Sequence, residues 1–269
     1  MSVTGKVVWI TGASSGIGEA LAKEFAKRGA NKLILSARRA AELERVRQAC
    51  VALGAAADGV AVLAFDITGE DAMGAVVDDA RARFGRLDLL INNAGISQRS
   101  LAVDTDMGVY RRIMEVDFFG QVALTKQVLP IMIEQGGGHI AVTASVAGKV
   151  GAPLRTGYCA AKHAVMGFFD ALRSEVARHG IAVSTIVPGF IRTDISVHAL
   201  SADGTAHGKM DADLAAGMDA DAAARVIAAG LARRQPEIPV GKGREMNLLW
   251  MKRLSPKAVF RLVERVGGG

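Results

Sequence analysis

The sequence predicts an α/β protein whose parallel sheet is wound in two halves, with helices on both faces. Short runs rich in β-branched residues alternate with longer segments of helical periodicity along all 269 residues. The short runs, such as Leu33-Ile34-Leu35, are apolar without alternation, which is typical of strands covered by helices on both sides. We expect about seven strands in a single domain, because a chain of this length builds one core more readily than two.

Six of the expected strands, and five helices between them, can be placed from these patterns. The strands are expected at residues 6–11, 32–37, 60–64, 87–92, 139–143 and 182–187. The helices are expected at residues 17–28, 40–53, 72–84, 109–133 and 157–179.

We divide the chain into a catalytic domain, residues 1–240, and a C-terminal extension, residues 241–269. The domain includes an irregular stretch at residues 191–218 that contains Gly204, Gly208 and Gly217. A loop this long inside a domain is usually a lid or a binding loop, with disorder as the alternative. We interpret it as a substrate loop.

The net charge of +6 is concentrated near the C-terminus. From Arg233 onward there are nine basic and three acidic residues, so the rest of the chain is balanced and does not indicate a nucleic-acid surface. No apolar run is long enough to span a bilayer, and the first strand starts too early to leave room for a signal segment. We therefore expect a cytoplasmic protein. Cys50, Cys159 and the five histidines have no metal-ligand spacing, so no metal is expected.

A glycine-rich segment joins the first predicted strand to the first predicted helix. Gly12 allows a sharp turn, Gly16 removes a side chain where a pyrophosphate would approach, and Gly18 lets helix and strand pack closely. The free N–H groups and positive dipole at the helix start favour phosphate. The residues expected to hold a dinucleotide here are Gly12, Ser14, Ser15, Gly16, Ile17 and Gly18.

The end of the second predicted strand indicates which dinucleotide binds. An NAD site needs a carboxylate there, about 20 residues after the glycines, to accept hydrogen bonds from the ribose 2′-hydroxyl. The chain has Ser36-Ala37-Arg38-Arg39 instead, without an acid. The planar Arg38 guanidinium fits a 2′-phosphate, so we expect NADP(H). Solvated arginines after a strand are the alternative interpretation.

Tyr158 and Lys162 are four residues apart on one face of a predicted helix. A free tyrosine titrates at about pH 10, and a neighbouring ammonium group lowers that pKa by stabilising the phenolate. The phenol can then exchange a proton with a substrate oxygen. Ser145 follows the fifth predicted strand, where its hydroxyl can orient a carbonyl beside the phenol. Tyr158, Lys162 and Ser145 are therefore candidate catalytic residues.

These motifs, in this order, resemble the short-chain dehydrogenase/reductase family. The spacing Gly-x-x-x-Gly-x-Gly, the segment Asn92-Asn93-Ala94-Gly95 and the segment Tyr158-Cys159-Ala160-Ala161-Lys162 all match its pattern. Residues 117–126 and Leu129-Pro130 are most similar to the member 7-like dehydrogenase/reductases. The resemblance covers nearly the whole chain. It implies a Rossmann fold, hydride transfer between NADP(H) and a carbonyl or secondary alcohol, and a homodimer or homotetramer.

The resemblance also assigns roles to further residues. Asp66 corresponds to the acid that holds the adenine amino group, and the Pro-Gly segment after the sixth strand meets the nicotinamide. For Asn92, a purely structural role is an equal alternative to cofactor contact. The implied cofactor-binding residues are Asp66, Ile67, Asn93, Ala94, Gly95, Tyr158, Lys162, Pro188, Gly189, Ile191 and Thr193.

One residue departs from the family pattern. Val116-Asp117-Phe118-Phe119-Gly120 has an aspartate where the family has an asparagine that helps hold a water behind the catalytic lysine. An ionised Asp117 cannot donate a hydrogen bond from its side chain. It would also compete for Lys162 and weaken the effect of that lysine on Tyr158. We expect activity to survive with a shifted pH profile, and we count Asp117 among the candidate catalytic residues.

The residues expected to face the substrate are, apart from Ser145, apolar. They are Ser145, Ile96, Val150, Leu154 and Phe190, although the apolar ones could equally be core residues. Together with the steroid-, retinoid- and lipid-like carbonyls associated with the subgroup, they indicate reduction of an apolar ketone or aldehyde. The alternative function is a catalytically weak redox sensor that only binds the dinucleotide, but such proteins usually lack the tyrosine–lysine pair. Extended-type sugar epimerases carry a different glycine spacing.

The C-terminal extension contains a predicted amphipathic helix that starts at Ser255-Pro256. Its apolar stripe consists of Val259, Leu262, Val263 and Val266, with Lys257, Arg261 and Arg265 around it. Packing against a partner subunit or the chain's own domain is one interpretation. Peripheral contact with an anionic membrane is the other.

Overall fold

The computed structural model, which describes residues 4–30 and 32–267, contains a seven-stranded sheet in which every strand pairing is parallel. The strand order is β3-β2-β1-β4-β5-β6-β7. The chain builds outward from β1 in one direction and from β4 in the other, so the order reverses between these two strands. The strands are β1 (Val7–Thr11), β2 (Lys32–Ala37), β3 (Val60–Ala64), β4 (Leu89–Asn92), β5 (Gly138–Thr143), β6 (Ile181–Pro188) and β7 (Glu237–Val240).

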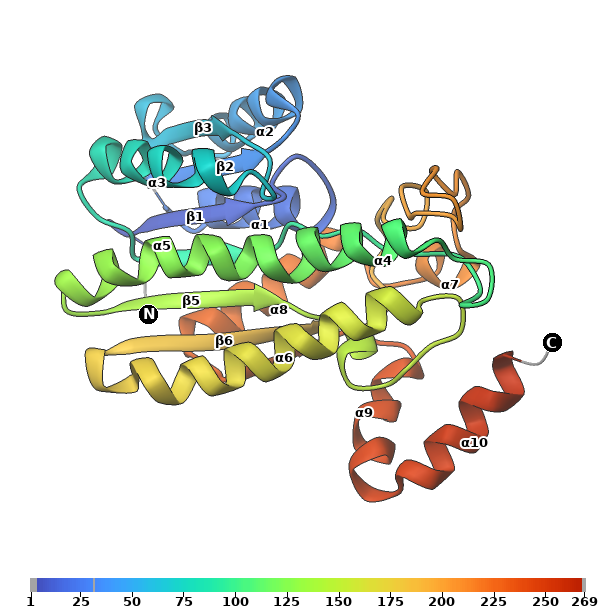
Figure 1. Cartoon of the computed structure of the whole chain (residues 1–269). Coiled ribbons are helices and arrows are strands. Elements are labelled where there is room, and N and C mark those ends of the chain that lie inside the picture. Colours follow the sequence, from blue (N-terminus) through green and yellow to red (C-terminus); the bar gives the residue numbers. More distant parts are fainter. Residues whose placement is uncertain (1–3, 31, 268–269) are drawn as a thin grey trace.

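Helices cover both faces of this sheet (Figure 1), which confirms the doubly wound Rossmann fold. Helices α1, α2 and α8 pack on one face, and α3, α5 and α6 on the other. The α-helices are α1 (Gly16–Lys27), α2 (Ala40–Ala52), α3 (Glu70–Phe84), α4 (Met107–Met114), α5 (Gly120–Glu134), α6 (Thr156–Val176), α7 (Ala212–Ala215), α8 (Ala220–Ala232), α9 (Glu245–Leu254) and α10 (Pro256–Gly267).

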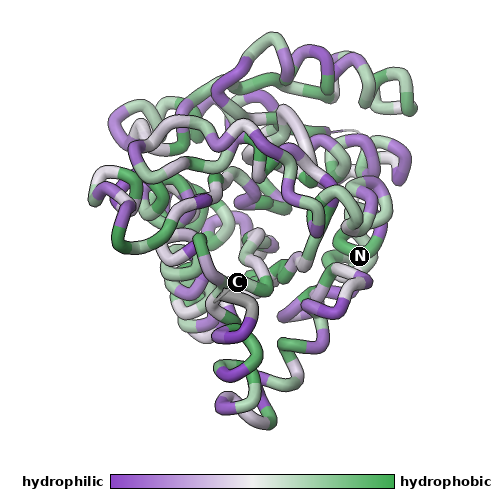
Figure 2. The backbone as a smooth tube through the Cα atoms, turned by 90° about the vertical axis from the view of Figure 1, so that its right-hand side faces the viewer, coloured by the Kyte–Doolittle hydropathy of each residue, from purple (hydrophilic) through white to green (hydrophobic). Residues whose placement is uncertain are grey.

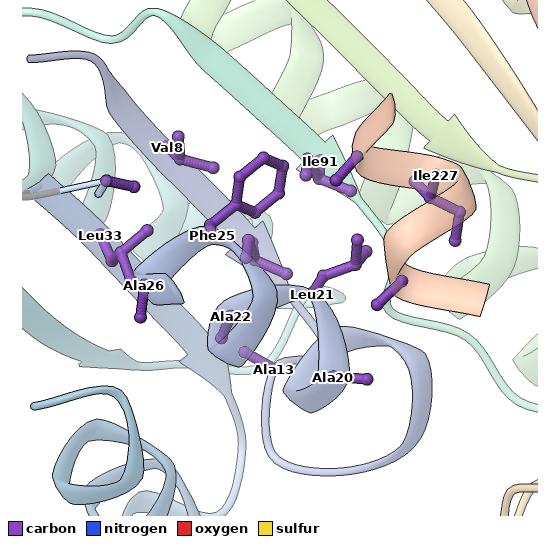
Figure 3. Packing of buried hydrophobic residues seen from close by; sticks show 14 of the residues in the cluster. Val8, Ala13, Ala20, Leu21, Ala22, Phe25, Ala26, Leu33, Ile91 and Ile227 are labelled. Atoms are coloured by element: carbon purple, nitrogen blue, oxygen red, sulfur yellow. The ribbon is translucent and has the colours of Figure 1, made fainter. Parts of the chain in front are cut away.

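Strand β1 shows why the strands are apolar on both sides. Val8 belongs to the core on the α1 side, and Trp9 belongs to the core on the opposite side. Leu21 and Phe25 of α1 belong to the same cluster as Val8, and Figure 3 shows them among hydrocarbon side chains between the helix and the sheet. Successive side chains of a strand point to opposite faces, so a strand buried on both faces needs consecutive apolar residues.

The predicted helix at residues 109–133 is wrong as one continuous helix. The chain forms α4, then five residues of π-helix, η2 (Glu115–Phe119), and then α5. A π-turn adds one residue to a helical turn and so rotates the side chains that follow, and such turns are frequent at functional sites. Here Asp117 lies inside η2 with its side chain fully buried.

The predicted substrate loop is irregular but tied to the rest of the domain. Single β-bridges connect Ile191 to Met218 and Gln98 to Leu200, and the loop contains one short helix, α7. These contacts favour the binding-loop interpretation over disorder. No helix within residues 4–30 and 32–267 is both long and apolar enough to cross a membrane.

Candidate active site

The glycine turn after β1 adopts a conformation that other residues would strain. Gly12 and Gly16 have φ of +64° and +56°. A Cβ on Gly12 would lie 2.8 Å from the Cα of Ala94, and one on Gly18 would lie 2.2 Å from the Gly12 carbonyl oxygen. Gly18 therefore packs helix against turn, and unlike Gly12 and Gly16 it does not line the cavity described below. The turn lines that cavity at the start of α1, where the sequence predicts a ligand phosphate.

The hydroxyl of Thr11 joins this turn to the one that follows β4. It accepts hydrogen bonds from the N–H groups of Asn93 (2.9 Å) and Ala94 (3.1 Å). The Asn93 amide group donates back to the Thr11 carbonyl at 3.2 Å. Asn92 is buried, donates to the Thr125 hydroxyl and does not line the cavity described below, which favours the structural alternative for this residue.

One large cavity of about 1140 Å³ runs along the carboxyl ends of the strands. It connects the glycine turn with the segment after β6 and with the C-terminal helices. Predicted cofactor-binding residues that line it are Gly12, Ser14, Ser15, Gly16, Ile17, Arg38, Asp66, Ile67, Asn93, Ala94, Gly95, Tyr158, Lys162, Pro188, Gly189, Ile191 and Thr193. Their convergence follows from the topology, because ligands of doubly wound sheets bind where the strand order reverses.

Two arginines, rather than one, lie at the β2 end of this cavity. Arg38 and Arg39 are both exposed and both line it. The Arg39 guanidinium also donates to the Ser14 hydroxyl at 3.2 Å, which brings it to the glycine turn. The sequence singled out Arg38, and only the fold shows that Arg39 reaches the same place.

Tyr158 and Lys162 lie in the first turns of α6 and share a face, as predicted. The Lys162 Nζ is 5.6 Å from the centre of the Tyr158 ring and donates to the Thr143 carbonyl at 3.0 Å. Ser145 follows β5, lines the cavity with Tyr158, and acts to lower the pKa of the phenol. The Ser145 hydroxyl accepts from the Ala147 N–H at 3.1 Å, which holds its position. The three candidate catalytic residues therefore meet inside the cavity.

Asp117 forms a direct ion pair with Lys162. The Asp117 Oδ2 lies 3.1 Å from the Lys162 Nζ, and the side chains are 0% and 4% exposed. The other carboxylate oxygen accepts the Ile96 N–H at 2.7 Å. The carboxylate thus fixes the chain after Gly95 while it competes for the lysine, the competition that the sequence led us to expect.

The charges of this cluster set its pKa values. Burial raises the pKa of Tyr158 above its usual range, the Asp117 charge adds to that rise, and the Lys162 charge opposes it. The net direction is opposite to the lowering that Lys162 alone predicts, because the sequence does not show the desolvation of the phenol. For Lys162, burial alone would lower the pKa, but Asp117 and Tyr158 raise it above its usual value. The lysine therefore remains charged.

The substrate end of the cavity is only partly as predicted. Ile96, Val150 and Phe190 line it together with Ser145. The prediction for Leu154 is wrong, since its side chain is 43% exposed and lies outside the lining. Leu154 has a positive φ of 62°, and its carbonyl accepts the Ser100 N–H. The residue therefore forms part of a turn, and its own side chain faces outward.

A second charged cluster, which the sequence did not reveal, ties the substrate loop to the domain. The Asp211 carboxylate accepts from Arg99 and from Arg155, the latter at 2.9 Å. Both arginines line the cavity. Arg99 and Arg155 are 112 and 56 residues from Asp211 in the chain, so no local sequence motif predicts these contacts.

The candidate site is without a metal-binding group in the part of the chain that the structure describes, since no set of three His, Cys, Asp or Glu residues there could hold an ion. Cys50 and Cys159 are free and buried. Burial raises the pKa of the Cys50 thiol to about 11, which makes it unreactive at neutral pH.

Comparison with known proteins agrees with this geometry. A family model described as short chain dehydrogenase matches residues 6–203. The Drosophila melanogaster protein named dehydrogenase/reductase SDR family protein 7-like is 41% identical over 262 residues, which cover 97% of this chain and 80% of that protein. The Bos taurus dehydrogenase/reductase SDR family member 7B is 39% identical over 264 residues, 97% of this chain and 81% of that protein.

Solved structures have the same fold. A short-chain dehydrogenase/reductase from Burkholderia phymatum, in complex with NAD, superposes with a TM-score of 0.84 at 26% identity and covers 96% of both chains. Levodione reductase superposes with a TM-score of 0.76 at 27% identity over 90% of this chain and 98% of that one. The chain therefore belongs to the short-chain dehydrogenase family of oxidoreductases and is similar to its member 7 and 7-like proteins.

Proposed function

We propose that this oxidoreductase uses NADP(H) and reduces an apolar ketone or aldehyde to the secondary or primary alcohol. The observation that carries the proposal is the meeting of Tyr158, Ser145 and Lys162 in the cavity that also contains the glycine turn. A carbonyl placed there would have a proton donor, a hydroxyl and a cation on one side. The bound cofactor would lie in the same cavity, along the predicted cofactor-binding residues.

The residues would act in the following way. When bound, NADPH supplies the hydride that reduces the carbonyl carbon. Ser145 holds the carbonyl oxygen, and the Tyr158 phenol gives that oxygen its proton. Because the pKa of Tyr158 is raised, the phenol is protonated at neutral pH and ready to act as an acid. Lys162 remains charged and stabilises the phenolate left behind.

The preference for NADP(H) is supported by the two arginines at the end of β2. Arg38 and Arg39 face the cavity where a 2′-phosphate would lie, and the residues at the end of β2 include no acid for a ribose 2′-hydroxyl. Arg38→Asp should raise the KM for NADPH far more than the KM for NADH. Arg39→Asp measures how the two arginines share the contact. Equal effects of Arg38→Asp on both cofactors would contradict the assignment.

The apolar substrate is supported by the cavity lining, where Ile96, Val150 and Phe190 surround the candidate catalytic residues. The relatives are named as dehydrogenase/reductases, and one structural neighbour is levodione reductase, a name that indicates reduction of a ketone. NADPH consumption should therefore be measured over ketosteroids, retinals, quinones and aliphatic ketones. Activity should rise with the apolar area of the substrate.

Tyr158→Phe is the decisive variant for the chemistry. It removes the proton donor but keeps the ring, so turnover should fall by about 100-fold or more while NADPH binding persists. Wild-type protein that binds NADPH but turns over none of these substrates would contradict the proposal. It would favour a redox sensor instead.

A further inference from the structure

The C-terminal hairpin, formed by α9 and α10, projects from the domain (Figure 1, red). Its base is fixed, because the Glu245 carboxylate accepts the Phe190 N–H at 3.1 Å, and Met246 and Leu249 pack on the core. Val259 is fully buried, so α10 is held against the rest of the hairpin. The side chain of Val266, the last residue of the predicted stripe, lies outside the described residues.

The inner face of the hairpin belongs to the cavity. Leu248 and Met251 of α9, together with Leu262 and Val263 of α10, line the same space as Tyr158. These four side chains give the hairpin part of the cavity wall an apolar surface. The hairpin is therefore a wall of the cavity as well as a projection.

The outer face of the hairpin is apolar and exposed. Trp250, Leu254 and Phe260 are 68%, 83% and 54% exposed. Large apolar side chains gathered on a projection usually mark a contact surface. In Figure 2 the hairpin lies at the bottom of the molecule, where hydrophobic and hydrophilic residues alternate along the tube.

The charges around this outer face are almost all positive. Five basic residues accompany the exposed apolar ones: Lys252, Arg253, Lys257, Arg261 and Arg265. The acids of the hairpin are Glu245, which is engaged at its base, and Glu264. The Lys252 Nζ lies 4.8 Å from the centre of the Phe260 ring, so a cation and an exposed ring are adjacent in the hairpin.

The exposed apolar and basic side chains of the hairpin together favour one kind of binding partner over another. A second copy of the chain, docked through the same face, would bring the two basic sets together and repel. An anionic bilayer attracts the basic side chains and receives the exposed rings and Leu254 at its interface. The charge pattern therefore favours a lipid surface.

We propose that the outer face of the C-terminal hairpin docks on anionic phospholipid membranes and that the inner face admits apolar substrate from the lipid into the cavity. The second half of this proposal rests on the apolar substrate proposed above. Membrane docking itself does not. The two can therefore fail separately.

The test is binding of the full chain to phosphatidylcholine vesicles with and without phosphatidylserine. Emission from Trp250 should shift to the blue on binding, whereas Trp9 is fully buried and its emission should stay constant. Binding should require phosphatidylserine and weaken at high salt, because salt screens the basic side chains. Absence of binding at low salt would overturn the proposal.

Two paired variants identify the surface. Leu254→Ser with Phe260→Ser, and Lys257→Glu with Arg261→Glu, should each weaken binding by about ten-fold or more. The control is Val103→Ser, which removes an exposed apolar side chain (88% exposed) outside the hairpin and should leave binding unchanged. Equal binding by all three variants would overturn the assignment of the surface.

Two further measurements separate the alternatives. Turnover of a water-soluble ketone should be the same in the paired variants and the wild type, while turnover of a vesicle-borne substrate should fall with vesicle binding. If the paired variants instead halve the mass measured by sedimentation and leave vesicle binding intact, a second copy covers this face and the proposal is wrong. Lack of turnover on every ketone would count against the proposed reaction and leave the binding result untouched.

Discussion

Asp117 and Asp211 both pair with cations beside the same cavity, but their pKa values move in opposite directions. For Asp117, burial outweighs Lys162 and the Ile96 N–H, and its pKa is raised. For Asp211, burial also acts to raise the pKa, but Arg99 and Arg155 outweigh it and the pKa is lowered. One buried cation does not offset the desolvation of the Asp117 carboxylate, whereas two guanidinium groups offset that of Asp211.

This difference separates a tuning role from an anchoring role. The charge of Asp117 is felt by Lys162 and Tyr158, so it belongs to the chemistry of the site. The Asp211 carboxylate instead pairs with Arg99 and Arg155 and so holds the substrate loop against the domain. Variants of the two clusters should therefore change different measured quantities.

The largest effect is expected from Lys162→Met. It leaves Asp117 buried without its cation and removes the group that stabilises the Tyr158 phenolate. We expect turnover to fall by about 100-fold or more and the free energy of unfolding to fall by about 3–5 kcal/mol. Steady-state kinetics and denaturant unfolding measure the two effects.

The control for Lys162→Met is the double variant Lys162→Met with Asp117→Asn. It removes the unpaired charge, so it should regain much of the lost stability but none of the activity. If the double variant is as unstable as the single one, Asp117 is not the buried charge that destabilises the Lys162 variant.

A smaller effect, on substrate binding, is expected from Asp211→Asn. The change frees the loop from Arg99, whose side chain is only 6% exposed, so KM should rise several-fold with little change in kcat, and unfolding should become easier by about 1–3 kcal/mol. Asp203→Asn is the matched control, since Asp203 lies in the same loop, is exposed and accepts only from Thr205 among its described contacts. A drop in kcat with unchanged KM would assign Asp211 to the chemistry instead.

The Asp211 effect should also depend on pH in a definite direction. Because its folded-state pKa lies below the unfolded value, the stability it contributes is present above a pH of about 4 and is lost as the pH falls through the folded-state pKa. The stability difference between wild type and Asp211→Asn should therefore shrink in acid. A difference that grows in acid would contradict the lowered pKa.

The smallest change in rate, but the clearest shift in pH dependence, is expected from Asp117→Asn. Asp117 raises the pKa of Tyr158, so its neutral replacement should lower that pKa. The acid limb of alcohol oxidation and the alkaline limb of carbonyl reduction should both move to lower pH, with the maximal rate changed by about ten-fold or less. An unchanged pH–rate profile would show that Asp117 has no tuning role.

The fold was predictable because its signals are local. Apolar runs such as Leu33-Ile34-Leu35 and the glycines after the first strand both report on residues near them in the chain. The seventh strand, β7, was expected but could not be placed, since it has four residues and contains Pro239. The π-helix at Asp117 was also missed, because no composition marks a π-turn.

The site was predictable where a motif places residues on one element, as with Tyr158 and Lys162. It was not predictable where the geometry depends on distant segments. The Asp211 cluster joins three parts of the chain, and Arg39 reaches Ser14 only after β1 and β2 pair. The net rise in the pKa of Tyr158 depends on burial, which a motif does not report.

The Thr11 hydroxyl links two segments of the cavity wall. This single hydroxyl accepts N–H groups that lie 82 and 83 residues away, and so it couples the phosphate turn to the chain that leads, through Gly95 and Ile96, to Asp117. The glycine turn and the segment that positions Asp117 are therefore fixed to each other through one side chain. Loss of the Thr11 hydroxyl would loosen both segments at once.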